Sequence, residues 1–396
     1  MNVNKDLNYA FALSRQCLRL FGIWPDPHVS VSDIRRPSLR FIIITCIVSF
    51  YVFVPQVTNI IRAWGNVALM VEHFASANFS MIALCKLVVT WYHGETLQML
   101  VTSVMTDWIT SSNWERYTMM KIARCSRSLS YRCYFFGAGT VGFYFVFNLT
   151  KFYQFFHQPQ RHFVYPIPYP YAQKSPNYEI TFFIQLCAGV YTVFIICTVD
   201  SFVSTLVLHM CSQLINLRTT LQNLIDEIAN KSMSSSKFRK NLSAIITRHE
   251  LIIRNAKALD NCFSAMLFVH MLSLTFQLCF QTFRVFTIIT EHLEVPFSKK
   301  CFLSCYVLLV VMLLWIYCYS AERLLEKSTG IAYGVYECKW YDLPSKNVKD
   351  LMFMIYRSAD PLILTAGKFG TFSIEMFGIT VKTSMGYLSV LLAMKD

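Results

Sequence analysis

The sequence has few charged residues and lacks the motifs of common enzyme chemistry. Only 15% of its 396 residues are Asp, Glu, Lys or Arg, whereas 55% are hydrophobic. Soluble globular chains carry about 25% charged residues, so this composition excludes an ordinary soluble protein. The chain also has no Walker loop, dinucleotide fingerprint, HExxH motif or GxSxG motif. We therefore expect neither enzymatic activity nor a cofactor.

Patterns that bind metal or nucleic acid are missing as well. The 14 cysteines form no CxxC pair and no Cys/His spacing typical of zinc. Most of them fall inside hydrophobic stretches, where free cysteine packs as a small apolar side chain. The net charge of +13 is not interleaved with a recognition motif, so we expect no metal and no nucleic-acid partner.

Long hydrophobic runs are what the sequence does contain. About 20 apolar residues in a helix cross a bilayer. The runs predict seven spans, at about residues 41–61, 67–92, 133–150, 180–208, 261–283, 301–321 and 371–394. The second and last spans also carry charged residues. We expect Lys86 in the second span to snorkel to the inner interface, and Asp200 in the fourth to reach water or a loop arginine. The fold class is therefore an all-α membrane protein, with residues 1–396 as one domain.

Basic residues gather on one side of these spans. Of the 36 Lys and Arg residues, 24 lie in segments 1–40, 94–132, 212–262 and 320–350, against eight in the opposite loops and at the C-terminus. Basic loops stay in the cytoplasm, where they face anionic lipid. The N-terminus is therefore predicted to be cytoplasmic, and seven crossings place the C-terminus outside. This topology is the reverse of that of G-protein-coupled receptors.

Apolar periodicity continues beyond the fourth and sixth spans. Leucine and isoleucine recur at helical spacing as far as Ile228, and again after a serine-rich turn at 231–237. We expect helical cytoplasmic extensions at about 209–260 and 322–366, including a helix over 347–366. These helices form an anchor domain, which is well shaped for holding subunits together.

The last span follows a stretch, 367–370, whose two glycines favour a bend. Beyond it, four residues recur at helical spacing: Thr380, Thr383, Tyr387 and Val390. Two interpretations remain open for this stripe, close helix packing or a pore lining with a hydrophobic constriction. Glu375 and Lys382 favour the pore, because charges inside a membrane seldom face lipid.

The connection between the third and fourth spans is rich in aromatic residues. Residues 152–171 contain eight aromatics and four prolines. Such a stiff, apolar loop either lies on the membrane surface as an aromatic belt or roofs an outer cavity. Asn148-Leu149-Thr150 is a glycosylation sequon at the outer end of the third span.

The order and spacing of short motifs resemble the insect odorant receptors along the whole chain. Residues 20–25 read LFGIWP, which matches the family's L-x-G-x-W-P opening. The family's S…A…Y…WY signature is matched by Ser328, Ala332, Tyr336, Trp340 and Tyr341. It is followed by Arg357, Pro361, AGKF at 366–369, Ser373, Phe377, Ser384 and Tyr387.

The resemblance implies a subunit of a ligand-gated, non-selective cation channel in the plasma membrane of olfactory neuron dendrites. Such channels are heterotetramers of a tuning subunit and a coreceptor, and Val390 matches the valine of their gate. The family's coreceptor has a longer loop after the fourth span, and a glutamine where this chain has Ala393. The chain therefore resembles a tuning subunit. Gustatory relatives have a Gln-Phe pattern that does not follow Tyr387 here.

By the same resemblance, odorant binds in the outer halves of spans two, three, four and six. Helical faces select seven ligand-binding candidates there: Phe74, Asn78, Tyr144, Asn148, Tyr191, Phe194 and Tyr306. Aromatic walls with one or two amides suit small volatile or apolar odorants. Three other classes of membrane protein compete with this function: a gustatory-type channel, a G-protein-coupled receptor, and a transporter, which the absence of inverted repeats disfavours.

Overall fold

The computed structural model describes residues 3–65, 67–155, 161–166, 174–230, 232–290 and 295–393. Residues 156–160 and 167–173 of the predicted aromatic loop lie outside this part of the chain. So do Lys231 in the predicted turn and Met394, the end of the last predicted span.

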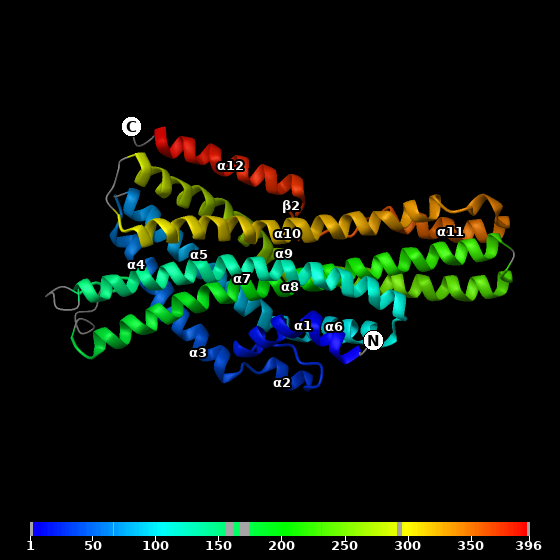
Figure 1. Cartoon of the computed structure of the whole chain (residues 1–396), viewed down its shortest axis with the longest axis horizontal. Helices are drawn as coiled ribbons and strands as arrows, with labels where there is room; N and C mark the ends of the chain where they lie inside the picture. The colour runs from blue at the N-terminus through cyan, green and yellow to red at the C-terminus, as the bar shows by residue number, and fades with distance from the viewer. Residues whose placement is uncertain are drawn as a thin grey trace.

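Four long helices run side by side along the long axis of the molecule (Figure 1). They are α7 (Asn113–Phe155), α8 (Asn177–Ala229), α9 (Ser235–Thr290) and α10 (Phe297–Tyr336). The 53 residues of α8 extend about 80 Å at 1.5 Å per residue, far more than the roughly 30 Å of a bilayer core. One end of the bundle must therefore project beyond the membrane.

The N-terminal part is built from shorter helices. These are α1 (Val3–Leu20), α2 (Val31–Arg35), α3 (Leu39–Val48), α4 (Val54–Arg62), α5 (Val67–Tyr92) and α6 (Gly94–Thr110). A π-helical turn, Ser49–Phe53, joins α3 to α4, so the first predicted span is one interrupted helix. Pro55 follows this turn and has no N–H to donate, which explains why regular α-helical bonding breaks there.

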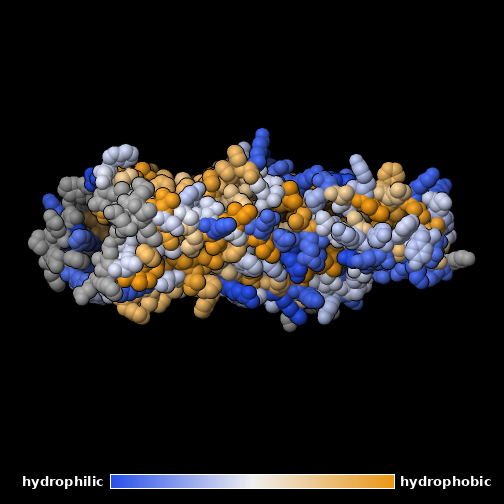
Figure 2. All heavy atoms as spheres, turned by 90° about the horizontal axis from the view of Figure 1, so that it is seen from above, coloured by the Kyte–Doolittle hydropathy of each residue, from blue (hydrophilic) through white to orange (hydrophobic). Residues whose placement is uncertain are grey.

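The exposed side chains divide the molecule along its length. Apolar residues dominate the left half of the surface in Figure 2, whereas hydrophilic residues dominate the right half. Within the described residues, six helices are long and apolar enough to cross a membrane: Val31–Arg62, His73–Tyr92, Asn113–Gln154, Asn177–Ala229, Ser235–Thr290 and Phe297–Tyr336. The seventh predicted span corresponds to α12 (Ile374–Ala393), which carries Glu375 and Lys382 and contacts α9 and α10.

The hydrophilic end of the bundle consists of the segments predicted as extensions, which we call the anchor region (residues 209–260 and 322–366). Here α8 ends at Ala229 and α9 begins at Ser235. A short helix, α11 (Ser345–Ser358), lies at the far end beside α10 (Figure 1). The prediction of a helix over 347–366 is wrong at its C-terminal end, because Pro361 disfavours helical continuation through the preceding residue.

A small hairpin connects the anchor region to α12. Strands β1 (Thr365–Ala366) and β2 (Gly370–Thr371) pair antiparallel. Gly367 in the turn has φ of +61°, a left-handed conformation that glycine adopts without strain. Its N–H donates to the carbonyl of Ser264 in α9 at 3.0 Å. The predicted bend is therefore a tight hairpin fastened to α9.

The core of the molecule is centred on α8. Residues 195–214 of α8 are buried on every side, enclosed by α5, α7, α9 and α10. A helix that is apolar all round is typical of such a central position. It also holds Asp200, His209 and Gln213, whose polar groups must find partners inside the protein.

Candidate functional site

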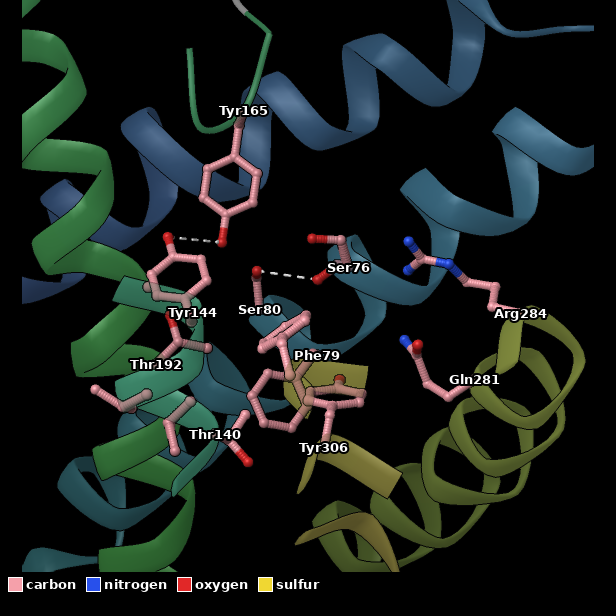
Figure 3. Close-up of a pocket in the computed structure, with 14 residues that line it drawn as sticks. Ser76, Phe79, Ser80, Thr140, Tyr144, Tyr165, Thr192, Gln281, Arg284 and Tyr306 are labelled. Carbon is pink, nitrogen blue, oxygen red and sulfur yellow. Dashed lines mark hydrogen bonds between the residues drawn. The ribbon is translucent and has the colours of Figure 1, made fainter. Parts of the chain in front are cut away.

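A cavity of about 100 Å³ lies among α5, α7, α8, α9 and α10 (Figure 3). Five aromatic side chains line it: Phe79, Tyr144, Tyr165, Phe302 and Tyr306. The cavity therefore has the apolar wall that is typical of sites for small organic ligands.

The aromatic wall is held by ring contacts between different helices. Phe79 of α5 meets Tyr306 of α10 edge to face, with ring centroids 5.1 Å apart. Phe302 lies 5.9 Å from Tyr306 and 6.1 Å from Tyr144 of α7. Such contacts add to the stabilisation from burial, so the wall is preformed rather than assembled by a ligand.

Tyr306 is fixed by a polar chain that crosses three helices. Its hydroxyl donates to Oε1 of Gln277 in α9 at 3.1 Å. The amide nitrogen of Gln277 in turn donates to the carbonyl of Ala75 in α5. This chain satisfies both buried side chains and sets the orientation of the Tyr306 ring toward the cavity.

Residues 161–166 close the cavity from above. The backbone N–H and carbonyl of Tyr165 bond to the Gln185 amide at 3.1 and 2.9 Å. The Tyr144 hydroxyl donates to that of Tyr165 at 3.5 Å (Figure 3), and Phe163 is buried beside Tyr178. Of the two interpretations of this loop, the described part fits a roof over a cavity.

Most hydroxyl groups in the cavity already have partners. Ser76 and Ser80 are bridged by Gln56, which donates to Ser76 at 2.6 Å and accepts from Ser80 at 2.8 Å. Thr140 and Thr192 donate to carbonyls in the preceding turns of their own helices. The remaining polar side chains, Gln281 and Arg284, come from α9.

The structure places two of the seven ligand candidates, Tyr144 and Tyr306, at the cavity. Both candidate amides lie outside its lining and are engaged elsewhere. Asn78 donates to the carbonyl of Ser273 at 3.0 Å, and Asn148 to that of Tyr144 at 2.8 Å. Because Asn148 is buried, its sequon is not accessible for glycosylation.

The other three aromatic candidates also lie outside the cavity lining. Tyr191 packs edge to face on Phe21, with centroids 6.5 Å apart. Phe74 and Phe194 are substantially exposed on the apolar half of the bundle. Their helices do reach the cavity, but these positions belong to neighbouring faces.

Sequence reasoning missed much of the cavity lining. Ser76, Phe79 and Ser80 share one face of α5 through their spacing of three and four residues, a signal that was available. Gln281 lies near the end of the fifth predicted span, and Arg284 directly follows it. These two residues were missed because the ligand was expected to contact only spans two, three, four and six, whereas the fifth span belongs to α9.

The predicted pore stripe is buried at its first residue and exposed at the other three. Thr380 is buried next to Ser384, whose hydroxyl donates to the Thr275 carbonyl of α9 at 3.2 Å. Thr383, Tyr387 and Val390 are exposed, and Val390 keeps 57% of its surface accessible.

Four ionisable side chains form a buried cluster at the centre of the bundle. Lys86 of α5 pairs with Asp200 of α8, and both are fully buried. The Tyr317 hydroxyl donates to Asp200 at 2.5 Å, and His270 lies 3.5 Å from the Lys86 amine. The expectations that Lys86 snorkels and Asp200 reaches water or a loop arginine are therefore wrong, because the two charges neutralise each other inside the protein.

Apolar spanning helices, a projecting anchor region and an aromatic cavity define a multi-pass membrane protein. Residues 66–385 match the family model described as "7tm Odorant receptor". The chain belongs to this seven-transmembrane odorant receptor family, which comprises receptors and not enzymes. Family membership favours an odorant receptor over a gustatory-type channel, a G-protein-coupled receptor or a transporter.

Curated relatives agree with this assignment. The chain is 25% identical to Odorant receptor 13a of Drosophila melanogaster over 58% of this chain and 57% of that protein. It is 22% identical to Odorant receptor Or2 of Anopheles gambiae over 91% of this chain and 94% of that protein. Similarity to the Anopheles gambiae odorant receptor coreceptor, at 24% identity, covers 38% of this chain and 30% of that one. The chain thus spans less than two thirds of the first relatives it matches.

A solved structure shows the same fold. The insect olfactory receptor OR5 from Machilis hrabei, in complex with eugenol, matches with a TM-score of 0.81. The match covers 98% of this chain and all of that chain at 12% identity. At this identity the likeness establishes the architecture of seven transmembrane helices.

Proposed function

We propose that this chain is the tuning subunit of an odorant-gated, non-selective cation channel in the plasma membrane of olfactory neurons. It binds small volatile or apolar odorants in its cavity and opens a pore together with a coreceptor. The observation that carries the proposal is the aromatic cavity among five helices of an odorant receptor fold.

The ligand site in this proposal is the cavity itself. Tyr144 and Tyr306 form opposite parts of its wall, and Phe79 and Phe302 complete it. Because these rings come from α5, α7 and α10, a ligand between them contacts three helices at once. Displacement of any ring then reaches the neighbouring helices directly, which supports a role in gating.

The pore in this proposal runs along α12. Glu375, Lys382 and Thr383 are exposed on this helix. Charged groups there are costly against lipid and are typical of a face that meets water or another subunit. Tyr387 and Val390 continue toward the C-terminus, and Val390 forms the apolar gate.

The anchor region is cytoplasmic in this proposal, and so is the N-terminus. Support comes from the bias of basic residues and from the hydrophilic surface at that end in Figure 2. A tag before Met1 is expected to stain only permeabilised cells, and a tag after Asp396 to stain intact ones. Staining of the N-terminal tag on intact cells would reverse the topology.

The partner in this proposal is a coreceptor, to which the chain is itself similar. Whole-cell current in response to a volatile panel tests it, with cells expressing this chain, a coreceptor, or both. We expect cells that express both subunits to give current in response to ligands that evoke no current from the coreceptor alone. Robust responses from this chain alone would contradict the need for a coreceptor. Identical responses from coreceptor alone would contradict its role in tuning.

A further inference from the structure

The cavity contains one buried polar group with unused capacity, the side-chain amide of Gln281. Only 5% of Gln281 is exposed, and it lines the cavity from α9. Its carbonyl oxygen Oε1 accepts no hydrogen bond from any residue that the structure describes. Because buried amide oxygens in proteins almost always have a partner, a group that donates to this oxygen is expected when the site is occupied.

Gln281 lies beside a second polar side chain from the same helix. Figure 3 shows the Gln281 amide and the Arg284 guanidinium extending from α9 toward the interior, across the cavity from Tyr144 and Tyr165. A guanidinium has five N–H donors, so Arg284 can serve a ligand oxygen alongside its other partners. One edge of the cavity therefore offers both an acceptor and donors.

The other hydroxyl groups of the lining already have partners in the protein. Ser76 and Ser80 are bonded through Gln56, and Thr140 and Thr192 donate within their helices. Gln281 Oε1 differs from them because this buried polar atom has no partner in the described part of the chain, so we expect the polar part of a ligand at α9 and its apolar part at the rings of Phe79 and Tyr306.

The volume of the cavity limits ligand size. A protein cavity of about 150 Å³ accepts benzene, and this cavity measures about 100 Å³. By this comparison a ligand of about four heavy atoms fits the cavity as it stands, and a ligand of about six heavy atoms fits when lining side chains shift slightly. A compact ligand of this size reaches both the aromatic wall and the α9 edge.

We propose that the cavity recognises small hydroxyl-bearing ligands, namely alcohols, and that Gln281 is the residue that selects for the hydroxyl group. This inference rests on the proposed function, since it assigns a ligand class to the same site. A hydroxyl group donates to Oε1 of Gln281 and accepts from Arg284 at the same time. A ketone or ester only accepts, and a hydrocarbon does neither.

Three probes of nearly equal size separate these classes: cyclopentanol, cyclopentanone and methylcyclopentane. Dose–response currents are recorded from cells expressing the chain with a coreceptor. We expect cyclopentanol to act at a concentration about tenfold lower than methylcyclopentane, the ratio that one hydrogen bond of ordinary strength supplies. The effective concentration of cyclopentanone is expected to be closer to that of methylcyclopentane than to that of cyclopentanol.

The variant Gln281→Met keeps the length of the side chain and removes the amide. We expect it to bring the three probes to within about twofold of one another, mainly by weakening the response to cyclopentanol. The control is Phe286→Leu, an exposed position on α9 outside the cavity lining, which is expected to preserve the preference. Surface biotinylation establishes that both variants reach the membrane.

Several outcomes would overturn the inference. A wild-type channel that does not prefer the alcohol contradicts it without any variant, as does one that answers other volatiles but none of the three probes. An equal effect of Gln281→Met on all probes would mean that the amide binds structural water instead. These outcomes leave the proposed function intact, whereas a complex that reaches the surface and answers no volatile contradicts the proposed function itself.

Discussion

Lys86 and Asp200 show how single residues stabilise the interior of this receptor. The two charges are 114 positions apart in the chain and fully buried. Removing one partner leaves an uncompensated charge, which typically costs about 3–5 kcal/mol, whereas neutralising both costs much less. Tyr317 strengthens the site because its hydroxyl also donates to Asp200.

Neutralising this pair therefore gives a non-additive prediction. Lys86→Met alone is expected to lower the thermal stability and surface abundance of the complex strongly. The double variant Lys86→Met, Asp200→Asn is expected to recover most of both, since Asn still accepts from Tyr317. Melting temperature in detergent and surface biotinylation measure the effect. A double variant as unstable as the sum of the single ones would show that the pair is not coupled.

Two glycines on neighbouring helices provide a matched pair of variants. A Cβ at Gly189 of α8 would overlap the Tyr144 hydroxyl, whereas a Cβ at Gly142 of α7 meets no described atom within 4 Å. Gly189→Ala is therefore expected to displace Tyr144 and weaken ligand responses about tenfold or more, and Gly142→Ala to leave them unchanged. Dose–response currents from cells expressing each variant with a coreceptor measure this difference. Equal responses from both variants would mean that the position of Tyr144 is irrelevant to activation.

Among the helices of the anchor region, α9 holds a histidine whose surroundings disfavour its charged form. Burial, together with the nearby Arg357 guanidinium, lowers the pKa of His249 to about 4. Glu250, Arg254 and Lys257 lie around the same groove between α9 and α11. His249 is neutral in the folded state, so protonation of the unfolded chain destabilises the fold as pH falls from about 6.5 toward 4.

The variant His249→Asn isolates this contribution. Melting temperature of the purified complex is measured between pH 7.5 and pH 4.5. Wild type is expected to lose stability on acidification more steeply than the variant, because only wild type gains a proton on unfolding. Parallel curves for the two proteins would contradict the assignment.

The helix α12 gives a prediction about gating. Val390 is exposed on the same side of α12 as Thr383 and Tyr387, and apolar rings gate pores by excluding water. Val390→Ser is expected to raise ligand-free current or change ion permeability, while the order of odorant potencies stays the same. Met385→Ser, on another exposed face of α12, is the control. A reshuffled odorant order with normal resting current would move Val390 from the pore to the ligand site.

The positions of the helices could be predicted from the sequence, but which side of each helix meets the cavity or a neighbouring helix could not. A bilayer demands about 20 apolar residues per crossing, so run lengths revealed the spanning helices. In the centre of the bundle this signal disappears, because residues 195–214 of α8 are buried all round and have no outward face. On α5 the sequence likewise did not show which face meets the cavity, so we predicted Phe74 as a ligand contact although Phe79 lines the cavity. The Lys86–Asp200 contact depends on tertiary packing that no local pattern encodes.

For the whole molecule, we propose that ligands in the cavity of this chain open the channel. The cavity connects five helices, while the anchor region lies at one end of the bundle (Figure 1). Phe302 lines this cavity, and its ring contacts both Tyr144 and Tyr306. Enlarging the cavity at this ring must therefore change which ligands fit.

The most direct test is whole-cell current evoked by a homologous series of cyclic alcohols in cells expressing a coreceptor with wild type, Phe302→Ala or Phe276→Ala. Phe276 is an exposed residue of α9 outside the cavity lining, so it controls for loss of an aromatic ring. We predict that Phe302→Ala shifts the preferred ligand toward larger members of the series and that Phe276→Ala keeps the wild-type preference. An unchanged size preference in Phe302→Ala, at normal surface abundance, would contradict the account.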